Sequence, residues 1–141
     1  MRWFFDTSVL VPAFLDEHVH HEASYKAYLK AQKKHDCCAV HSLAEVYATL
    51  TRLPGDLRTS GDQAMLFLAD MAERLTFVAL DAEEYWTTIA GAAELGVLGG
   101  QTYDALLARC ALKAKAETIL TWNLAHFQRL GSSITKLVRT P

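Results

Sequence analysis

The feature that most constrains the fold is a short apolar run that ends at a carboxylate, Trp3-Phe4-Phe5-Asp6. Three large apolar residues are too few for a helix of their own and predict a strand that is buried on both faces. A carboxylate is costly inside an apolar layer unless it is paired or hydrogen-bonded, so we expect Asp6 at the carboxyl end of the strand. In open parallel α/β sheets, ligands bind in the crevice at that end. We therefore predict that residues 3–5 form the central strand and that Asp6 is the first residue of the site.

Apolar runs alternate with amphipathic segments along the rest of the chain. The runs predict further strands at 37–40, 76–80, 117–122 and 136–139. The amphipathic segments predict helices at 7–15, 18–34, 42–52, 60–75, 81–95, 102–115 and 123–130. This alternation, without a repeat or a linker, indicates an α/β fold in which helices cover both faces of a parallel sheet. The length of 141 residues fits a single domain, residues 1–141.

Composition and charge narrow the class of protein. The chain is 51% apolar and 21% charged, as in ordinary soluble globular proteins, and no stretch approaches the ~18 consecutive apolar residues of a membrane span. A net charge of −2 argues against a broad phosphate-binding surface but allows a local basic patch. The three cysteines are an odd number with two adjacent, so we expect no disulfide framework and a reducing, cytoplasmic location. No signal peptide is expected, because Asp6 and Pro12 interrupt the N-terminal apolar stretch.

Four polar residues are each predicted to lie either just after a strand or at the start of a helix. They are Asp6, Glu45, Asp104 and Asn123. In a parallel sheet, the helix N-termini that follow strands all point to the same crevice. Carboxylates that meet there repel one another, and a hard divalent cation relieves that repulsion. Carboxylate oxygens are the ligands that Mg²⁺ and Mn²⁺ prefer, and such ions activate water for displacement at phosphorus.

Each of the later three residues also has a purely structural interpretation. Glu45 and Ser42 have the spacing of a capping box. Asp104 follows a possible cap at Thr102, in a first turn where the helix dipole favours a negative charge. Asn123 is itself a preferred N-cap residue. Caps of this kind contribute about 1 kcal/mol each, so the residues alone leave both interpretations open.

The segments around these four residues resemble, in order, the motifs of the PIN-domain ribonucleases, particularly the VapC-type toxins. The matching segments span essentially the whole chain: Asp6-Thr7-Ser8-Val9-Leu10, Ser42-Leu43-Ala44-Glu45-Val46, Tyr103-Asp104-Ala105-Leu106-Leu107-Ala108 and Thr121-Trp122-Asn123-Leu124-Ala125-His126-Phe127. The resemblance implies a three-layer α/β/α fold with a central, mostly parallel sheet of four to five strands. It also implies an Mg²⁺- or Mn²⁺-dependent endoribonuclease that acts on RNA, a cognate antitoxin and usually a homodimer. Carried over by position, Asp6, Glu45 and Asp104 are the catalytic, metal-binding acids.

The chain departs from the family's pattern at the fourth position. Many relatives have a further acidic residue within 121–127, where this chain has Asn123 and His126. An amide oxygen can ligate a hard cation but brings no charge, so we keep Asn123 in the catalytic set and leave one or two metal ions open. The alternative function is a catalytically weakened PIN-like module that binds RNA or a protein. A third hypothesis, Asp6 as a phosphoryl-accepting nucleophile, is disfavoured because Ser8 stands where haloacid-dehalogenase-type enzymes have a second aspartate.

Residues around the acids are predicted to support them or to contact the substrate. Thr7, Ser8 and Thr121 are placed to fix carboxylates or metal-bound waters. Arg52 is placed beside a turn where it could contact substrate phosphates, a solvated helix end being the simpler interpretation.

Two aromatic residues of the matching segments, Tyr103 and Trp122, are predicted to lie in the core. An aromatic side chain close to the crevice can instead stack on a nucleobase.

Overall fold

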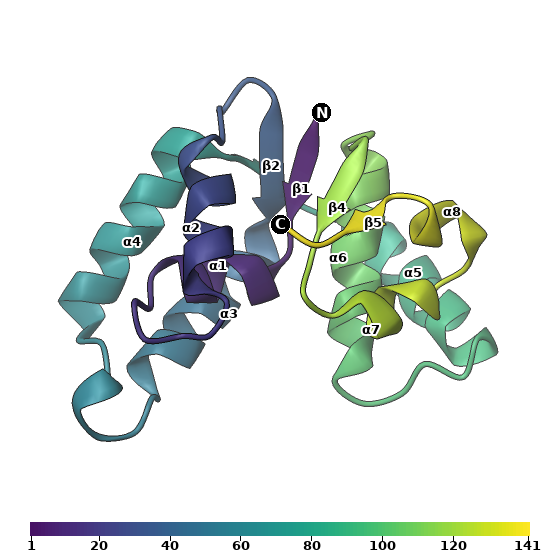
Figure 1. Ribbon diagram of the computed structural model, residues 1–141. Coiled ribbons are helices and arrows are strands. Elements are labelled where there is room, and N and C mark those ends of the chain that lie inside the picture. The colour runs from purple at the N-terminus through teal and green to yellow at the C-terminus, as the bar shows by residue number, and fades with distance from the viewer.

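The computed structural model describes all 141 residues and contains one five-stranded sheet (Figure 1). The strands are β1 (Trp3–Phe5), β2 (Asp36–Ala39), β3 (Thr76–Val78), β4 (Thr118–Leu120) and β5 (Val138–Arg139). Their order is β3-β2-β1-β4-β5, and every neighbouring pair is parallel. The predicted parallel sheet is confirmed, with β1 at its centre.

Eight α-helices connect and cover the strands. They are α1 (Thr7–Ala13), α2 (His21–Leu29), α3 (Val40–Thr51), α4 (Gly61–Arg74), α5 (Ala82–Glu94), α6 (Gln101–Lys113), α7 (Leu124–Gln128) and α8 (Ser132–Thr135), with a 3₁₀ turn at Gly55–Leu57. The predicted helices are all present, and the largest difference is that α2 is shorter than 18–34. The four-residue α8 and the 3₁₀ turn were not predicted, because elements this short carry no periodic pattern. No helix has both the length and the apolar character that crossing a membrane needs.

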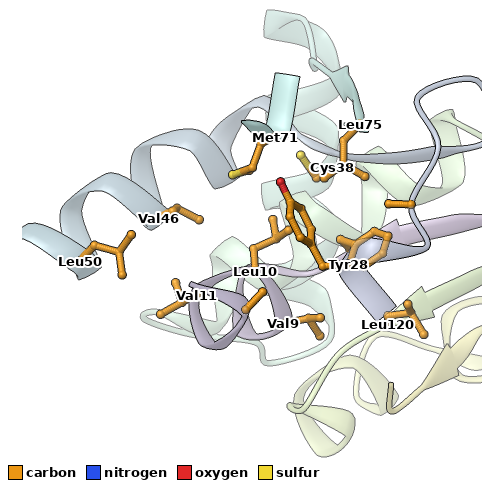
Figure 2. Packing of buried hydrophobic residues seen from close by; sticks show 13 residues of the cluster. Val9, Leu10, Val11, Tyr28, Cys38, Val46, Leu50, Met71, Leu75 and Leu120 are labelled. Carbon is orange, nitrogen blue, oxygen red and sulfur yellow. The ribbon is translucent and has the colours of Figure 1, made fainter. Parts of the chain in front are cut away.

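The alternation of side chains along the strands divides the core into two clusters, one on each face of the sheet. One cluster contains Phe5, Leu120 and buried residues of α1 to α4 (Figure 2). The other contains Phe4, Ile119 and buried residues of α6 to α8. The adjacent Cys37 and Cys38 are divided in the same way between the two clusters. The sheet therefore lies between two helical layers, which confirms the three-layer α/β/α fold.

The carboxyl ends of β1, β2 and β4 lie together in the middle of the sheet. The first residue of α1 is two positions after β1, α3 follows β2 directly, and α7 begins shortly after β4. Helix α6 runs against the strand direction, because its last turn leads through residues 114–117 into the start of β4. Its first turn is therefore at the same edge as the carboxyl ends. The fold brings the starts of α1, α3, α6 and α7 to one place, where sheets of this kind bind ligands.

Candidate active site

Asp6 lies at the base of the site, 2% exposed, as the N-cap of α1. Its carboxylate accepts hydrogen bonds from the Ser8 backbone N–H at 3.4 Å, the Ser8 hydroxyl at 2.6 Å and the Thr121 hydroxyl at 2.7 Å. All three bonds end at Oδ2. The other oxygen, Oδ1, makes no further hydrogen bond of ordinary geometry, although the Thr7 backbone N–H also lies close enough to the carboxylate to lower its pKa. Because no enclosed side-chain oxygen in the protein lacks a partner, Oδ1 keeps some contact with solvent. The fold thus fixes the carboxylate through one oxygen and leaves the other available to a ligand.

The two hydroxyl groups that hold Asp6 are themselves held. Ser8 Oγ accepts a hydrogen bond from the Trp122 backbone N–H at 3.0 Å, and Thr121 Oγ1 accepts one from the Asn123 N–H at 2.9 Å. Because each hydroxyl accepts from the backbone, its own proton is available to Asp6. These bonds connect the start of α1 to the segment after β4, as expected of residues that position a carboxylate.

Glu45 lies in the second turn of α3 and faces α1. Its Oε1 accepts a hydrogen bond from the Thr7 hydroxyl at 3.0 Å, and His41 Nε2 lies 3.7 Å from the same oxygen. The predicted capping box is wrong: α3 begins at Val40, so Ser42 is buried inside the helix and its hydroxyl lies 3.0 Å from that of Thr7. Glu45 is therefore held by α1 rather than by the end of its own helix.

Asp104 lies in the first turn of α6, and its Oδ2 is 3.2 Å from His126 Nδ1 in α7. The predicted cap at Thr102 is wrong, because α6 begins one residue earlier, after Gly100, with no side-chain cap. The helix dipole still favours a negative charge in this first turn, but no capping bond involves Asp104. Its contacts belong to the crevice.

The charge of Asp6 raises the pKa values of both Glu45 and Asp104, which places these carboxylates within electrostatic reach of Asp6. Burial raises the pKa of Asp6, although the hydrogen bonds from Ser8 and Thr121 oppose it. Burial raises the pKa of Glu45, with a smaller contribution from the charge of Asp6. Burial, and then the charges of Asp6 and Glu45, raise the pKa of Asp104 to about 6, against the opposing effect of His126. No Lys or Arg side chain pairs with these carboxylates, so their negative charge is opposed only by His41 beside Glu45 and His126 beside Asp104.

A divalent cation fits this donor set in chemistry and in charge. Carboxylate oxygens suit hard cations, and Asp6 Oδ1 and Glu45 Oε2 make no hydrogen bond within the chain. No three His, Cys, Asp or Glu side chains lie close enough, as they stand, to hold a metal ion together. A cation held by all three carboxylates would therefore require the half-buried Glu45 and Asp104 side chains to adopt other positions.

The two remaining predicted residues lie at the margins of the site. Asn123 occupies the N-cap position of α7, but its exposed side chain makes no capping bond, so this part of the structural interpretation is wrong. Arg52 follows the last residue of α3, seven residues beyond Glu45, or about 10 Å along the helix axis. The fold does not bring Arg52 to the carboxylates.

Sequence reasoning missed two histidines and misplaced one aromatic residue. His41 precedes Glu45 by four residues, a helical spacing that could have identified the pair. The contact of His126 with Asp104 joins two different helices, and no local pattern predicts it. Tyr103 is not in the core: it is 50% exposed, and its ring is stacked on that of His41. The half-buried Trp122 does pack against the core, as predicted.

Known proteins are similar in sequence to this chain along most of its length. The family model described as "PIN domain" matches residues 3–131. Ribonuclease VapC40 of Mycobacterium tuberculosis is 38% identical over 119 residues, which cover 84% of this chain and 84% of that protein.

Solved structures share the fold at lower identity. VapC20 of M. tuberculosis, described as a sarcin-ricin loop cleaving toxin, has a TM-score of 0.71 at 14% identity, covering 86% of this chain and 89% of its own. A chain of VapBC2 from Rickettsia felis, bound to a DNA fragment from its promoter, has a TM-score of 0.66 at 21% identity, covering 99% of this chain and 98% of its own.

Proposed function

The chain belongs to the PIN domain family and to its VapC group, and from this premise we propose that it is an Mg²⁺- or Mn²⁺-dependent endoribonuclease that hydrolyses RNA phosphodiester bonds. The observation that carries the proposal is the placement of three carboxylates at one sheet edge, near enough for the charge of Asp6 to raise the pKa values of the other two, with Asp6 fixed by the Ser8 and Thr121 hydroxyl groups. The identity to ribonuclease VapC40 over 84% of the chain supports the same activity.

In this proposal Asp6, Glu45 and Asp104 hold the cation. Bound there, the ion activates water and stabilises the charge of an in-line displacement at phosphorus. Ser8 and Thr121 fix Asp6 through their hydroxyl groups, and Thr7 fixes Glu45.

The exposed amide of Asn123 can orient a water molecule or offer one neutral oxygen. Because it brings no charge, we expect a second cation to bind only weakly or together with substrate phosphate.

We further propose that the protein is the toxin of a toxin–antitoxin pair in the cytoplasm. Its resemblance to VapC toxins supports a cognate antitoxin, and the similar fold in the VapBC2 assembly is consistent with that partner. A homodimer follows from the family resemblance alone. The three buried free cysteines suit a reducing compartment.

Cleavage of total RNA by the purified protein tests the activity. We expect a discrete product in Mn²⁺, none in excess EDTA, and a loss of orders of magnitude in folded Asp6→Asn. Undiminished cleavage by Asp6→Asn in EDTA would contradict the proposal. The absence of a charged residue at Asn123 favours a second candidate, the weakened binding module. RNA binding by the wild-type protein in Mn²⁺ without any cleavage would establish that candidate instead.

A further inference from the structure

Two pairs of stacked aromatic rings flank the carboxylates. They differ in how far the rings are exposed and in whether a hydrogen bond holds them. On the β4 side, the rings of Trp122 and His20 are 3.8 Å apart and nearly parallel, at 9°. Trp122 Nε1 also donates a hydrogen bond to Ser24 Oγ at 2.9 Å. The indole is thus covered on one face and fixed at its edge, which is how a structural aromatic residue is held.

On the α3 and α6 side, the pair is open. The rings of His41 and Tyr103 are 5.1 Å apart at 10°, and Tyr103 is 50% exposed. No hydrogen bond to the Tyr103 hydroxyl holds this ring in place. The pair also touches the reaction centre, because Tyr103 immediately precedes Asp104 and His41 Nε2 lies 3.7 Å from Glu45 Oε1.

The surface next to this pair is apolar. His41 is part of the wall of a cavity of about 300 Å³ between α3, β3, α5 and α6, and ten of its eleven lining residues are hydrophobic. No Lys, Arg, Asp or Glu lines it. The cavity beside His41 therefore offers mainly apolar surface, and no Lys or Arg side chain lines it. A ligand that reaches it is recognised through an unpaired flat ring.

We propose that the Tyr103–His41 stack is a nucleobase subsite, at which an unpaired base next to the scissile phosphate stacks on the open face of Tyr103. This inference rests on the ribonuclease activity proposed above and adds to it a contact for one base that is not paired in a duplex. Bases inside a duplex are already stacked and paired, so they cannot reach such a ring. Stacking on one aromatic face also tolerates any base, so the subsite adds affinity without reading sequence.

The test measures binding of single-stranded RNA that carries 2-aminopurine at successive positions, in the nuclease-inactive Asp6→Asn background. Tyr103→Ala should weaken binding between about five- and about 150-fold, the range for one stacked base. Tyr103→Phe keeps the ring and should bind as the parent does, whereas Tyr103→Leu keeps apolar area without a ring and should behave like Tyr103→Ala. Quenching of 2-aminopurine at one position should persist in Tyr103→Phe and vanish in the other two variants. The matched control is Trp86→Ala, an aromatic residue of α5 that is 79% exposed, which should change nothing.

Equal binding by Tyr103→Ala and its parent overturns the subsite, as does equal binding by the Leu and Phe variants. If Tyr103→Ala leaves RNA binding intact but releases a co-purifying partner protein, the ring serves that protein and the subsite is again overturned. Wild-type cleavage of RNA in Mn²⁺ separates these results from failure of the proposed function. A wild-type protein that neither binds nor cleaves RNA overturns both.

Discussion

Two aspartates lie at opposite ends of the adjacent strands β1 and β2, and both are buried, yet their surroundings differ. Asp36, at the start of β2, is 0% exposed, and both of its oxygens are used. It accepts from Arg2 Nε at 3.0 Å and Nη2 at 2.5 Å, and from the backbone N–H groups of Trp3 and Gln32. Asp6, which follows β1, pairs with no cation within the chain, and its bonds from Ser8 and Thr121 all end at Oδ2.

The difference is the one we expect between a structural carboxylate and one that, in the proposed function, is held for a ligand. The charge of Asp36 is balanced by Arg2, and its lone pairs are occupied, so it has no remaining capacity to bind. Asp6 keeps an open oxygen and an uncompensated charge, and burial raises its pKa. Burial of an unpaired charge is costly, and a site that binds a cation recovers that cost when the cation is present.

Exchanging each aspartate for asparagine should produce opposite effects, and these are the largest we expect. Asp6→Asn should reduce RNA cleavage by orders of magnitude while the fold persists, and in EDTA the free energy of unfolding should not fall. Asp36→Asn should lower that free energy by about 2–4 kcal/mol, because Arg2 loses its charged partner. Its cleavage rate per folded molecule should stay at the wild-type value. Denaturant unfolding and RNA cleavage on both variants check this, and a destabilised Asp6→Asn with full activity would reverse the assignment.

The pH dependence of the free energy of unfolding extends the comparison of the two sheet ends, because it responds to carboxylates that have no balancing cation. The pKa of Asp104 is raised from 3.8 to about 6, so between these values the folded protein keeps a proton that the unfolded chain has released. In EDTA, stability should therefore fall as the pH rises through this window, by about 3 kcal/mol from this group.

Melting temperatures at about pH 4 and pH 7 measure this effect, with Asp104→Asn as the control that lacks the group. The drop from the lower to the higher pH should be larger in the wild type than in Asp104→Asn, and saturating Mn²⁺ at pH 7 should remove most of the excess. Identical drops in the two proteins would mean that Asp104 is not part of a repelling cluster.

The hydroxyl groups that hold Asp6 should matter less than the carboxylate but more than ordinary surface hydroxyls. Thr121→Val removes the donor to Asp6 Oδ2 and the acceptor for the Asn123 N–H, and we expect a loss of about 1–3 kcal/mol in unfolding free energy together with weaker cleavage. The matched control is Thr87→Val on α5, an exposed threonine that bonds only to carbonyl oxygens of its own helix. Equal unfolding free energies for the two variants would remove Thr121 from the support of Asp6.

The smallest effect should come from the position that lacks an acid. Asn123→Asp adds one charge at an exposed position beside the crevice, worth about 1 kcal/mol, and should tighten Mn²⁺ binding by about fivefold. Gln128→Glu adds the same charge at the other end of α7 and should change the affinity much less. Equal changes in Mn²⁺ affinity for the two substitutions would show that only the overall charge matters and that Asn123 does not lie near the ion.

The sequence predicted those features that depend on neighbouring residues. The run that ends at Asp6 placed both the central strand and the base of the site, because an apolar layer excludes a carboxylate. The same rule failed at Asp36, which was left outside the predicted strand. Asp36 belongs to β2 because Trp3, the first residue of the neighbouring strand β1, and Arg2, which precedes it, satisfy its carboxylate. A contact between strands leaves no local pattern.

Errors at the helix starts had a similar origin. The capping box was wrong because α3 begins at Val40, directly after the strand, and this shift moves Ser42 and Glu45 from the helix end onto the side that faces α1. Tyr103 was placed in the core because it follows the apolar periodicity of α6. The first turn of that helix lies at the sheet edge, where no layer covers the ring, which is half exposed. The pairing of His126 with Asp104 depends on how α6 and α7 pack, and only the fold reveals it.

Calorimetric titration with Mn²⁺ of the wild type, Asp6→Asn and Asp36→Asn tests the central claim most directly. Circular dichroism first establishes that each variant is folded under the conditions used. We predict that the wild type and Asp36→Asn bind Mn²⁺ with the same affinity and stoichiometry, and that Asp6→Asn shows no binding in the same concentration range. Wild-type affinity in Asp6→Asn would contradict the claim that this buried, half-bonded carboxylate is held for a metal ion.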